Sequence, residues 1–407
     1  MANVEIPRGT RAPVGPVDGD LIAHGGVQLT AASGDRIQVR GDVEFSGDTV
    51  VGCSLECRGL RIRDGTLRVH GALTVHEELV ADDSRVEVEG ALTATRVEVD
   101  RMLRLGADSR AERVEVGGEL VVQRSLTAET VTVGGRVTAA GSIEARVVEA
   151  GGMFQAEVVK LESLEVGGAV ELGSGSIREK IEVGGVFRSK GRLEFGNLEV
   201  GGQVDLGGPT KGRRIEVGGT FTAHSDLEFD QLEVGGVAEI QGPGRGNSIE
   251  IGGQLSTHRS LTLTGRLEVG GRARIAEDLI ASDLDIGGMF VARSAVLSGN
   301  AEVGGSVQTE RGLKAKRIEL HRKSTASGPL IGERVELGRK CRAEDIWGHT
   351  VELEERGQAR RIYGGTIYLG EGSFVEEVQY TDTLHSDPSV TIRRPPEHVA
   401  RLPDPPL

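Results

Sequence analysis

A short pattern, apolar-acidic-apolar-Gly-Gly, recurs through the chain and constrains its fold more than any other feature. Its first glycine falls at positions 117, 134, 151, 167, 184, 201, 218, 235, 252, 270, 287 and 304, so the step is constant except for one that is shorter and one that is longer by a single position. A unit of about 17 residues is too short for a helix-turn-helix repeat or a propeller blade. Apolar and polar residues alternate within each unit, which indicates strand. The repeat therefore predicts an all-β fold, a parallel β-solenoid with about 17 residues per coil.

The residues two and four positions after the second glycine are expected to point into the solenoid. They form the pairs Phe154/Ala156, Val170/Leu172, Phe187/Ser189, Val204/Leu206, Phe221/Ala223, Ala238/Ile240, Leu255/Thr257, Ala273/Ile275 and Phe290/Ala292. A larger first residue is followed by a smaller second one, and the reverse. Close-packed interiors require such compensation. The pairs predict coils that stack in register around a narrow lumen, and they account for the low aromatic content of 3%.

A longer repeat is superimposed on alternate coils. Gly-rich stretches at 173–180, 207–214 and 241–248 recur on every second coil, which duplication of a two-coil unit explains. The stretch GGPTKG (207–212) lacks the GxxxxGK[ST] spacing of a phosphate-binding loop, so we expect no nucleotide cofactor.

Composition excludes several classes of protein. Glycine is frequent (61 of 407 residues), but it is not found at every third position and there are only 12 prolines, which excludes collagen. The net charge of −14 argues against nucleic acid as a partner, because binding needs a basic surface. Cys53, Cys57 and Cys341 make no disulfide framework and are expected to be free thiols. With no apolar span and no signal peptide evident, we expect a cytoplasmic protein.

Proline marks the expected boundaries. Three prolines lie before residue 17 and six between 388 and 406, whereas the long body between them has only three. Proline cannot donate to a strand ladder. We therefore predict a disordered tail at 1–19, a β-helix at 20–385 and a disordered proline-rich tail at 386–407. The β-helix would have irregular coils at 20–84, regular coils at 85–371 and an aromatic cap at 340–385. The second tail is either a polyproline II motif that binds a partner or an inert solubilising segment.

The acidic position of the repeat is expected to form an outward ladder, one carboxylate per coil. Its members include Glu165, Glu182, Glu199, Glu216, Glu233, Glu250 and Glu268. A basic residue stands two positions earlier at Arg113, Lys180, Arg214, Arg266, Arg317 and Arg334, where it can neutralise part of the ladder. The ladder is either a solvated face that sets the strand register or a surface that recruits cations or a basic partner.

No catalytic or metal-binding constellation is evident. The nine histidines are scattered, and the two that share a column, His224 and His258, are two coils or about 9.6 Å apart, too far to share a metal. We therefore expect no enzyme activity, no metal and no cofactor.

Every Trp and Tyr follows the last strict repeat, which ends at Gly305. These residues are Trp347, Tyr363, Tyr368 and Tyr380, with Phe374 among them. The sequence predicts that they form one cluster, which is either a cap on the solenoid or a polymer contact. Charged substitutions at Phe374 and Tyr380 are expected to prevent assembly if the cluster is a contact.

The repeat resembles that of the bactofilins, a polymer-forming cytoskeletal family. The resemblance rests on alternating segments such as IEVGGVF (181–187) and LEVGGQV (198–204), which recur once per coil, and on the proline-rich flanks. It implies a right-handed three-sided β-helix that assembles end to end into nonpolar filaments without nucleotide, often near membranes. The repeat body here is longer than is usual in the family. Val4 and Ile6 are the only apolar candidates for a membrane-targeting peptide near the start.

The resemblance thus implies a cytoplasmic scaffold whose main partner is itself, with a membrane surface or partner proteins contacted through the tails. Two other classes stay open. One is a monomeric structural rod or surface adhesin, and the other is a glycan-active β-helix enzyme, which would need convergent carboxylates in a cleft.

Overall fold

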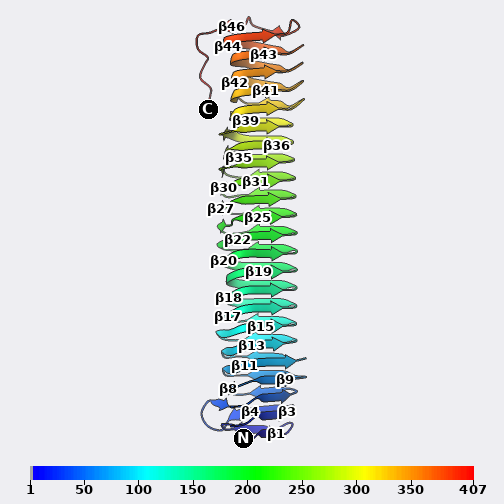
Figure 1. Ribbon diagram of the computed structural model, residues 1–407, viewed down its shortest axis with the longest axis vertical. Helices are drawn as coiled ribbons and strands as arrows, with labels where there is room; N and C mark the ends of the chain where they lie inside the picture. The colour runs from blue at the N-terminus through cyan, green and yellow to red at the C-terminus, as the bar shows by residue number, and fades with distance from the viewer. Residues whose placement is uncertain (1–2) are drawn as a thin grey trace. The chain divides into compact units, whose positions relative to one another are not determined.

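The computed structural model describes residues 3–407, and every regular element in this range is a β-strand. The strands pair in parallel to form a β-solenoid of about 23 turns, about 17 residues apart, which confirms the predicted all-β parallel solenoid. The chain divides into two compact units, residues 1–201 and 202–407. Figure 1 shows strands stacked coil upon coil within each unit.

Within its described residues, 3–201, the first unit contains 22 strands. They are β1 (Val4–Ile6), β2 (Arg11–Val14), β3 (Leu21–His24), β4 (Val27–Ala31), β5 (Arg36–Gln38), β6 (Val43–Ser46), β7 (Thr49–Val51), β8 (Ser54–Cys57), β9 (Leu60–Arg63), β10 (Thr66–Val69), β11 (Leu73–Asp82), β12 (Arg85–Val88), β13 (Leu92–Val99), β14 (Met102–Leu105), β15 (Ser109–Val116), β16 (Glu119–Val122), β17 (Ser125–Val133), β18 (Arg136–Ala150), β19 (Met153–Val166), β20 (Ala169–Val183), β21 (Val186–Ser189) and β22 (Leu193–Val200).

The second unit contains the other 24 strands. They are β23 (Gln203–Leu206), β24 (Thr210–Lys211), β25 (Arg214–Val217), β26 (Thr220–Ala223), β27 (Leu227–Glu228), β28 (Gln231–Val234), β29 (Val237–Ile240), β30 (Gly244–Gly246), β31 (Ser248–Ile251), β32 (Gln254–Thr257), β33 (Leu261–Leu263), β34 (Arg266–Val269), β35 (Arg272–Ala281), β36 (Asp283–Ile286), β37 (Met289–Leu297), β38 (Asn300–Val303), β39 (Ser306–Leu320), β40 (Thr325–Ser327), β41 (Leu330–Leu337), β42 (Arg342–Leu353), β43 (Gln358–Leu369), β44 (Phe374–Ser386), β45 (Thr391–Ile392) and β46 (Glu397–His398).

Each coil has three sides. On each side, a strand pairs with the strand that lies one full coil later, so the pairings form three series. In the first unit β1, β3, β6 and β9 pair in succession and make face one. Strands β2, β4, β7 and β10 make face two, and β5, β8 and the first part of β11 make face three. Longer strands such as β19 bend around corners and contribute to all three faces. In the second unit the same order repeats, with β23 on face two, β24 on face three and β25 on face one.

The interior columns are those that the sequence predicts. In the first unit Phe154 pairs with Val170 and Val170 with Phe187. In the second unit Phe221 is followed by Ala238, and Ala273 by Phe290. The four phenylalanines Phe154, Phe187, Phe221 and Phe290 have no exposed surface. Large and small residues therefore alternate along the column as well as within each coil, which keeps the lumen filled.

The paired glycines stand at corners where successive coils come very close. A Cβ placed on Gly134 would lie 2.4 Å from the carbonyl oxygen of Gly117, one coil earlier. Real Cβ atoms do not approach backbone oxygen so closely, so this corner admits only glycine. The glycine excess of the sequence is thus a packing requirement of the corners.

The flanks differ from the disordered tails that the proline content predicts. Strands β1 and β2 lie within residues 1–19, and β45 and β46 lie within residues 386–407. Pro13 is inside β2, opposite Thr30 of β4. The carbonyls of Thr10 and Val14 accept hydrogen bonds from the amides of Gln28 and Ala32, so the backbone of Pro13 faces the other way, toward the open edge. Proline fits a strand at such an edge because no ladder bond is lost.

At the other flank, Pro395 and Pro396 lie between β45 and β46, and Pro388 precedes β45. After His398 the trace turns back and runs beside the coils of the second unit (Figure 1). Within residues 3–407 there is no helix long and apolar enough to cross a membrane.

Candidate functional site

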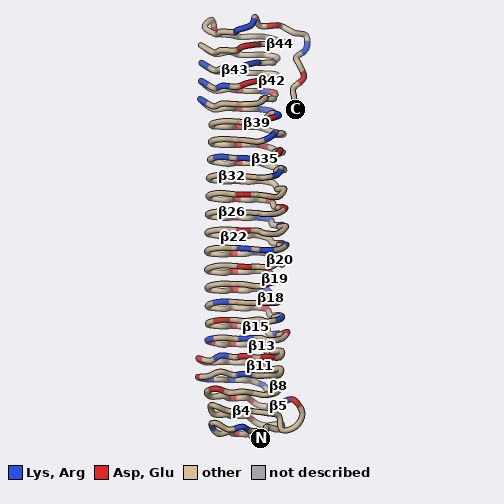
Figure 2. The backbone as a smooth tube through the Cα atoms, turned by 180° about the vertical axis from the view of Figure 1, so that it is seen from behind, with Lys and Arg blue, Asp and Glu red and all other residues tan. Residues whose placement is uncertain are grey.

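Face one carries the predicted acidic ladder in both units. In the first unit Glu165, Glu182 and Glu199 are paired coil to coil. In the second unit the same pairing joins Glu216, Glu233, Glu250 and Glu268. Figure 2 shows acidic positions recurring at the same place on successive coils, with basic residues beside some of them.

All six basic residues that the sequence places beside the ladder form ion pairs with it. Each contacts the carboxylate two residues later, and five of the six also reach the acid one coil further on. In the first unit Lys180 binds Glu182, and its Nζ lies 3.4 Å from Glu199. In the second unit Arg214 lies 3.2 Å from Glu216 and 3.5 Å from Glu233. The prediction that these side chains neutralise part of the ladder is confirmed.

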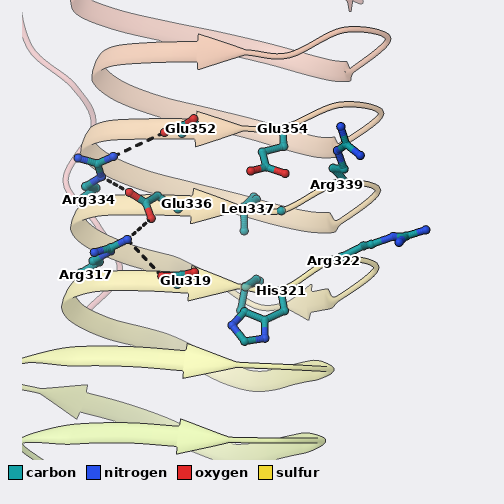
Figure 3. Close-up of a pocket in the computed structure, with 12 residues that line it drawn as sticks. Arg317, Glu319, His321, Arg322, Arg334, Glu336, Leu337, Arg339, Glu352 and Glu354 are labelled. Carbon is teal, nitrogen blue, oxygen red and sulfur yellow. Dashed lines mark hydrogen bonds and ion pairs between the residues drawn. The ribbon is translucent and has the colours of Figure 1, made fainter.

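The ladder is most continuous in a shallow hollow of the second unit (Figure 3). Arg317 lies 3.2 Å from Glu319 and 2.5 Å from Glu336. Arg334 binds the same Glu336 and lies 3.6 Å from Glu352. Glu336 thus joins two arginines from successive coils, and its side chain is only 16% exposed. The hollow continues past the ladder to His321, Arg322, Arg339 and Glu354.

In this hollow the negative charges of the carboxylates are balanced by positive charges. Its carboxylates face guanidinium groups that are part of the same chain, so little free charge is left to attract a ligand. Exposed ion pairs contribute little to stability because water and salt screen them, but they oppose a slip of one coil against the next. Within residues 3–407 no group of three or more His, Cys, Asp or Glu is arranged to hold a metal ion.

Asp345 and Asp278 are among the carboxylates outside the ladder that arginine side chains hold. Asp345 is buried, and both Arg360 and Arg361 grip it in bidentate fashion, with Nε–Oδ1 distances of 2.9 and 2.8 Å. Burial acts to raise the pKa of Asp345, but the hydrogen bonds of Arg361 and Arg360 outweigh it and hold the pKa below its usual range. Sequence reasoning did not single out this cluster.

The second clamp joins Asp278 to Arg293. The side-chain hydrogen bonds of Arg293 and then Ser294 lower the pKa of Asp278 to about 2. Both clamps tie residues that are about one coil apart in sequence, which suits a role in fixing a corner.

The five predicted aromatic residues do not form one cluster. On face three, Trp347 and Tyr363 have ring centroids 4.9 Å apart. Tyr368 stacks on His385 on face one, also at 4.9 Å, and Tyr380 meets His398 edge-on at 5.2 Å. Phe374 lies on face two, opposite Thr391, and is 37% exposed. The prediction of a single cluster is therefore wrong, because successive aromatics fall on different sides of the coil.

A contact that the sequence did not predict joins Trp347 to the last residues of the chain. Its indole Nε1 donates a hydrogen bond of 3.2 Å to the carbonyl oxygen of Pro403. Lys314 likewise donates from Nζ to the backbone oxygen of Leu407, at 3.3 Å. The sequence does contain a sign that these outward positions are covered. Ile346-Trp347 and Ile362-Tyr363 each place two apolar residues in a row, where the alternation of a strand calls for only one.

Both ends of the described chain have strands that are paired on one side only. In the first unit β1 pairs with β3 and β2 with β4, with no strand on their other sides among residues 3–201. In the second unit the end of β44, Thr383–Ser386, pairs with β43 on face one, and no described strand of that unit covers its other edge. Unpaired strand edges are templates for another chain.

The three cysteines are free thiols, as predicted. Cys57 is fully buried, and burial raises the pKa of its thiol to about 12. Burial also raises the pKa of Cys341. Thiols of this kind stay protonated and unreactive, because the thiolate is the nucleophile and the metal ligand.

In comparisons with protein-family models, with curated proteins and with solved structures, the chain gives no significant match.

Proposed function

We propose that the protein is a structural scaffold that assembles into filaments without nucleotide by stacking the ends of its β-helix. The observation that carries the proposal is the open strand edge on face one at each end of the described chain. In the first unit this edge is β1, and in the second unit it is the Thr383–Ser386 part of β44. The bactofilin-like repeat supports the same function.

The free backbone groups at these edges can be assigned from the bonds on the paired side. The amide of Val4 donates to the carbonyl of Asp20, so the backbone N–H and C=O of Val4 face β3. Those of Glu5 face away from β3. The amide of Asp387 donates to the carbonyl of Leu369, so the backbone groups of the odd-numbered residues at the end of β44 face β43. The backbone N–H and C=O of Leu384 therefore face away from β43. Each end thus offers N–H and C=O groups without a partner in its own unit.

If β1 of a second copy paired in parallel with the open edge of β44, the columns of the two copies would fix the register of this pair. Val4 of that copy would follow Leu384 in the inward column, and both are apolar. Glu5 of that copy would lie beside His385, so a carboxylate would meet an imidazole rather than another acid. A match in both pattern and charge is what a specific end-to-end contact requires.

The proposal includes a right-handed coil, a location in the cytoplasm and association with a membrane surface through the flanks. It assigns the protein no catalytic role and no cofactor.

The test is negative-stain electron microscopy of the purified chain without ATP or GTP. We expect unbranched filaments from the wild-type chain and none from a Leu384→Pro variant, because proline removes an N–H that points out of the end of the solenoid. The matched control is Leu384→Ala, which keeps that N–H and should still form filaments. Filaments from Leu384→Pro, or single particles from the wild type, would overturn end stacking on face one.

The prolines of the flanks favour a second candidate, a monomeric structural protein or surface adhesin. Pro13 faces the open edge of β2, and natural proteins use proline at edges to block unwanted pairing. This candidate predicts a monomer at all concentrations in light scattering. Cell fractionation would then separate a surface location from a cytoplasmic one.

A further inference from the structure

One outward-facing column on face three of the second unit is largely apolar. Strand pairing places its members one coil apart, in the order Ile280, Val296, Lys314, Ile331, Trp347, Tyr363 and Gln379. The neighbouring inward column holds residues such as Leu330 and Ile346, which fill the lumen. Outward positions of a solenoid normally face water, so this column calls for an explanation.

Half of the column is covered and half is open. Ile280 and Val296 are 52% and 39% exposed, whereas Ile331 and Tyr363 are only 7% and 6% exposed. The cover is the chain's own segment 401–407, whose residues 401–405 border a hollow together with Ile331, Trp347 and Tyr363. The segment reaches as far as Lys314, which binds the backbone oxygen of Leu407. The exposed members of the column lie beyond that point.

The segment makes its described contacts through side chains of the column and not as a further strand. No hydrogen bond between two backbone groups joins residues 400–407 to the coils. The last such bond runs from the Val399 amide to the carbonyl of Tyr380. Its sequence, Arg-Leu-Pro-Asp-Pro-Pro-Leu, has three prolines without an N–H to offer a ladder. Only Leu402 and Leu407 are half-buried, and the residues between them are exposed.

These contacts are those by which proteins hold polyproline II segments. Such segments keep their backbone carbonyls free and are pre-ordered by proline, so aromatic surfaces with an N–H donor bind them at a small entropic cost. Here Trp347 supplies both the surface and the donor, with Tyr363 packed against it.

We propose that the column from Lys314 to Tyr363 is a binding site for extended proline-rich segments, and that residues 401–407 of a second copy of this chain exchange with the chain's own segment. The contacts depend on two leucine anchors and two hydrogen bonds to backbone oxygens, none of which requires that the segment belong to the same chain. A second copy offers an identical ligand. The chain's own segment has the advantage of a high effective concentration, so exchange becomes prominent where copies are crowded, as in an assembly.

The chain carries its own reporter for this exchange, because Trp347 is its only tryptophan. Replacing both anchors, Leu402→Asp with Leu407→Asp, should uncover the indole and shift its fluorescence to longer wavelength without changing the far-ultraviolet circular dichroism. The matched control is Pro395→Ala with Pro396→Ala, which alters exposed prolines between β45 and β46 and should leave the emission unchanged. Equal emission from the anchor variant and the wild type would show that the segment does not cover Trp347 and would overturn the proposal.

A synthetic peptide with the sequence of residues 399–407 then tests the site. Added to the anchor variant, it should return the emission to shorter wavelength and saturate, while a peptide of the same composition in scrambled order should not. The absence of a saturable shift would overturn the binding site.

A second chain tests the proposed occupant. Trp347→Phe has an intact segment and no tryptophan, so any change on mixing it with the anchor variant comes from the latter's indole. We expect a shift to shorter wavelength that grows with the concentration of the Trp347→Phe chain, and none when that chain also carries the two leucine substitutions. Peptide binding without this shift would exclude a second copy as the occupant. Placing Leu384→Pro in both chains keeps the result independent of end stacking.

Discussion

The ring of Phe229 lies against Gly246, so close that a Cβ at position 246 would come within 2.3 Å of the ring carbon Cε2. Phe229 is buried, and Gly246 ends β30 on the next coil of the second unit. Gly246, in the Gly-rich stretch at 241–248, therefore leaves the space that a phenylalanine of the preceding coil requires. This relationship gives a physical reason for the two-coil repeat, in which bulky and glycine-rich coils alternate.

Gly246→Ala should accordingly destabilise the second unit by about 1–3 kcal/mol, the usual cost of overpacking a filled interior. The midpoint of thermal unfolding measures the effect. In a Phe229→Ala background the same substitution should cost much less, since the ring that it meets is gone. Gly15→Ala serves as the control, because nothing lies within 4 Å of a Cβ there. Equal effects of Gly246→Ala in both backgrounds would contradict the assignment of Phe229 as the obstacle.

Gly134→Ala should be at least as destabilising as Gly246→Ala, and no single second substitution should rescue it. The atom that the new methyl group would meet is the carbonyl oxygen of Gly117, which is backbone and cannot be removed by mutation. Hydrogen exchange of the amides around residues 117–152 would measure the loss locally. Unchanged protection of these amides would show that the corner can widen at little cost.

The Asp278–Arg293 clamp predicts an acid-sensitive contribution to stability. The pKa of Asp278 is lowered from 3.8 to about 2, so the folded state favours the ionised form. The stabilisation is fully present above pH 3.8 and is lost as the pH falls through about 2. In Asp278→Asn the decline of the melting temperature between these pH values should be shallower than in the wild type. Parallel declines in the two proteins would show that the clamp does not contribute.

The aromatic residues near the end of the second unit give a graded prediction for assembly. Tyr380→Asp should weaken the last coil, because the ring meets His398 of β46 edge-on. Phe374→Asp places a charge beside β45, at a site that is already 37% exposed. We expect both to reduce filament formation in sedimentation assays, Tyr380→Asp more strongly. Filaments of normal yield from both variants would show that neither ring contributes to the contact.

The acidic ladder should set register rather than recruit cations. Of the seven ladder acids named above, five form ion pairs with arginine or lysine of the same chain. The Arg317–Glu336–Arg334 contacts extend this pattern. Removing divalent ions with a chelator should leave both the melting temperature and the assembly unchanged. A loss of filaments that magnesium or calcium reverses would favour the cation-recruiting interpretation.

The residues that fill the lumen were predicted well from the sequence, because their packing depends on neighbours within the same coil. Phe154 and Ala156 are separated by a single position, and the compensation between them can be seen within one coil. The flanks were predicted poorly because the fit of Pro13 depends on which side of β2 is open, and that is decided by the position of the coil in the stack. The aromatic residues show a third case. Trp347 and Tyr363 are one coil apart and share a column, whereas Tyr368, which follows Tyr363 on the same strand, has passed a corner onto another face.

Because the stacked corner glycines recur on every coil of the strict repeat, units of two coils are interchangeable. Removing residues 218–251 of the second unit would join Val217 directly to Gly252 and leave the Ile-Glu-Val-Gly-Gly pattern intact across the junction. Recombination between such repeats therefore yields chains that differ by whole coils and still have matching neighbours. The number of coils is open to selection by gene duplication and loss, while the chemistry of each coil stays the same.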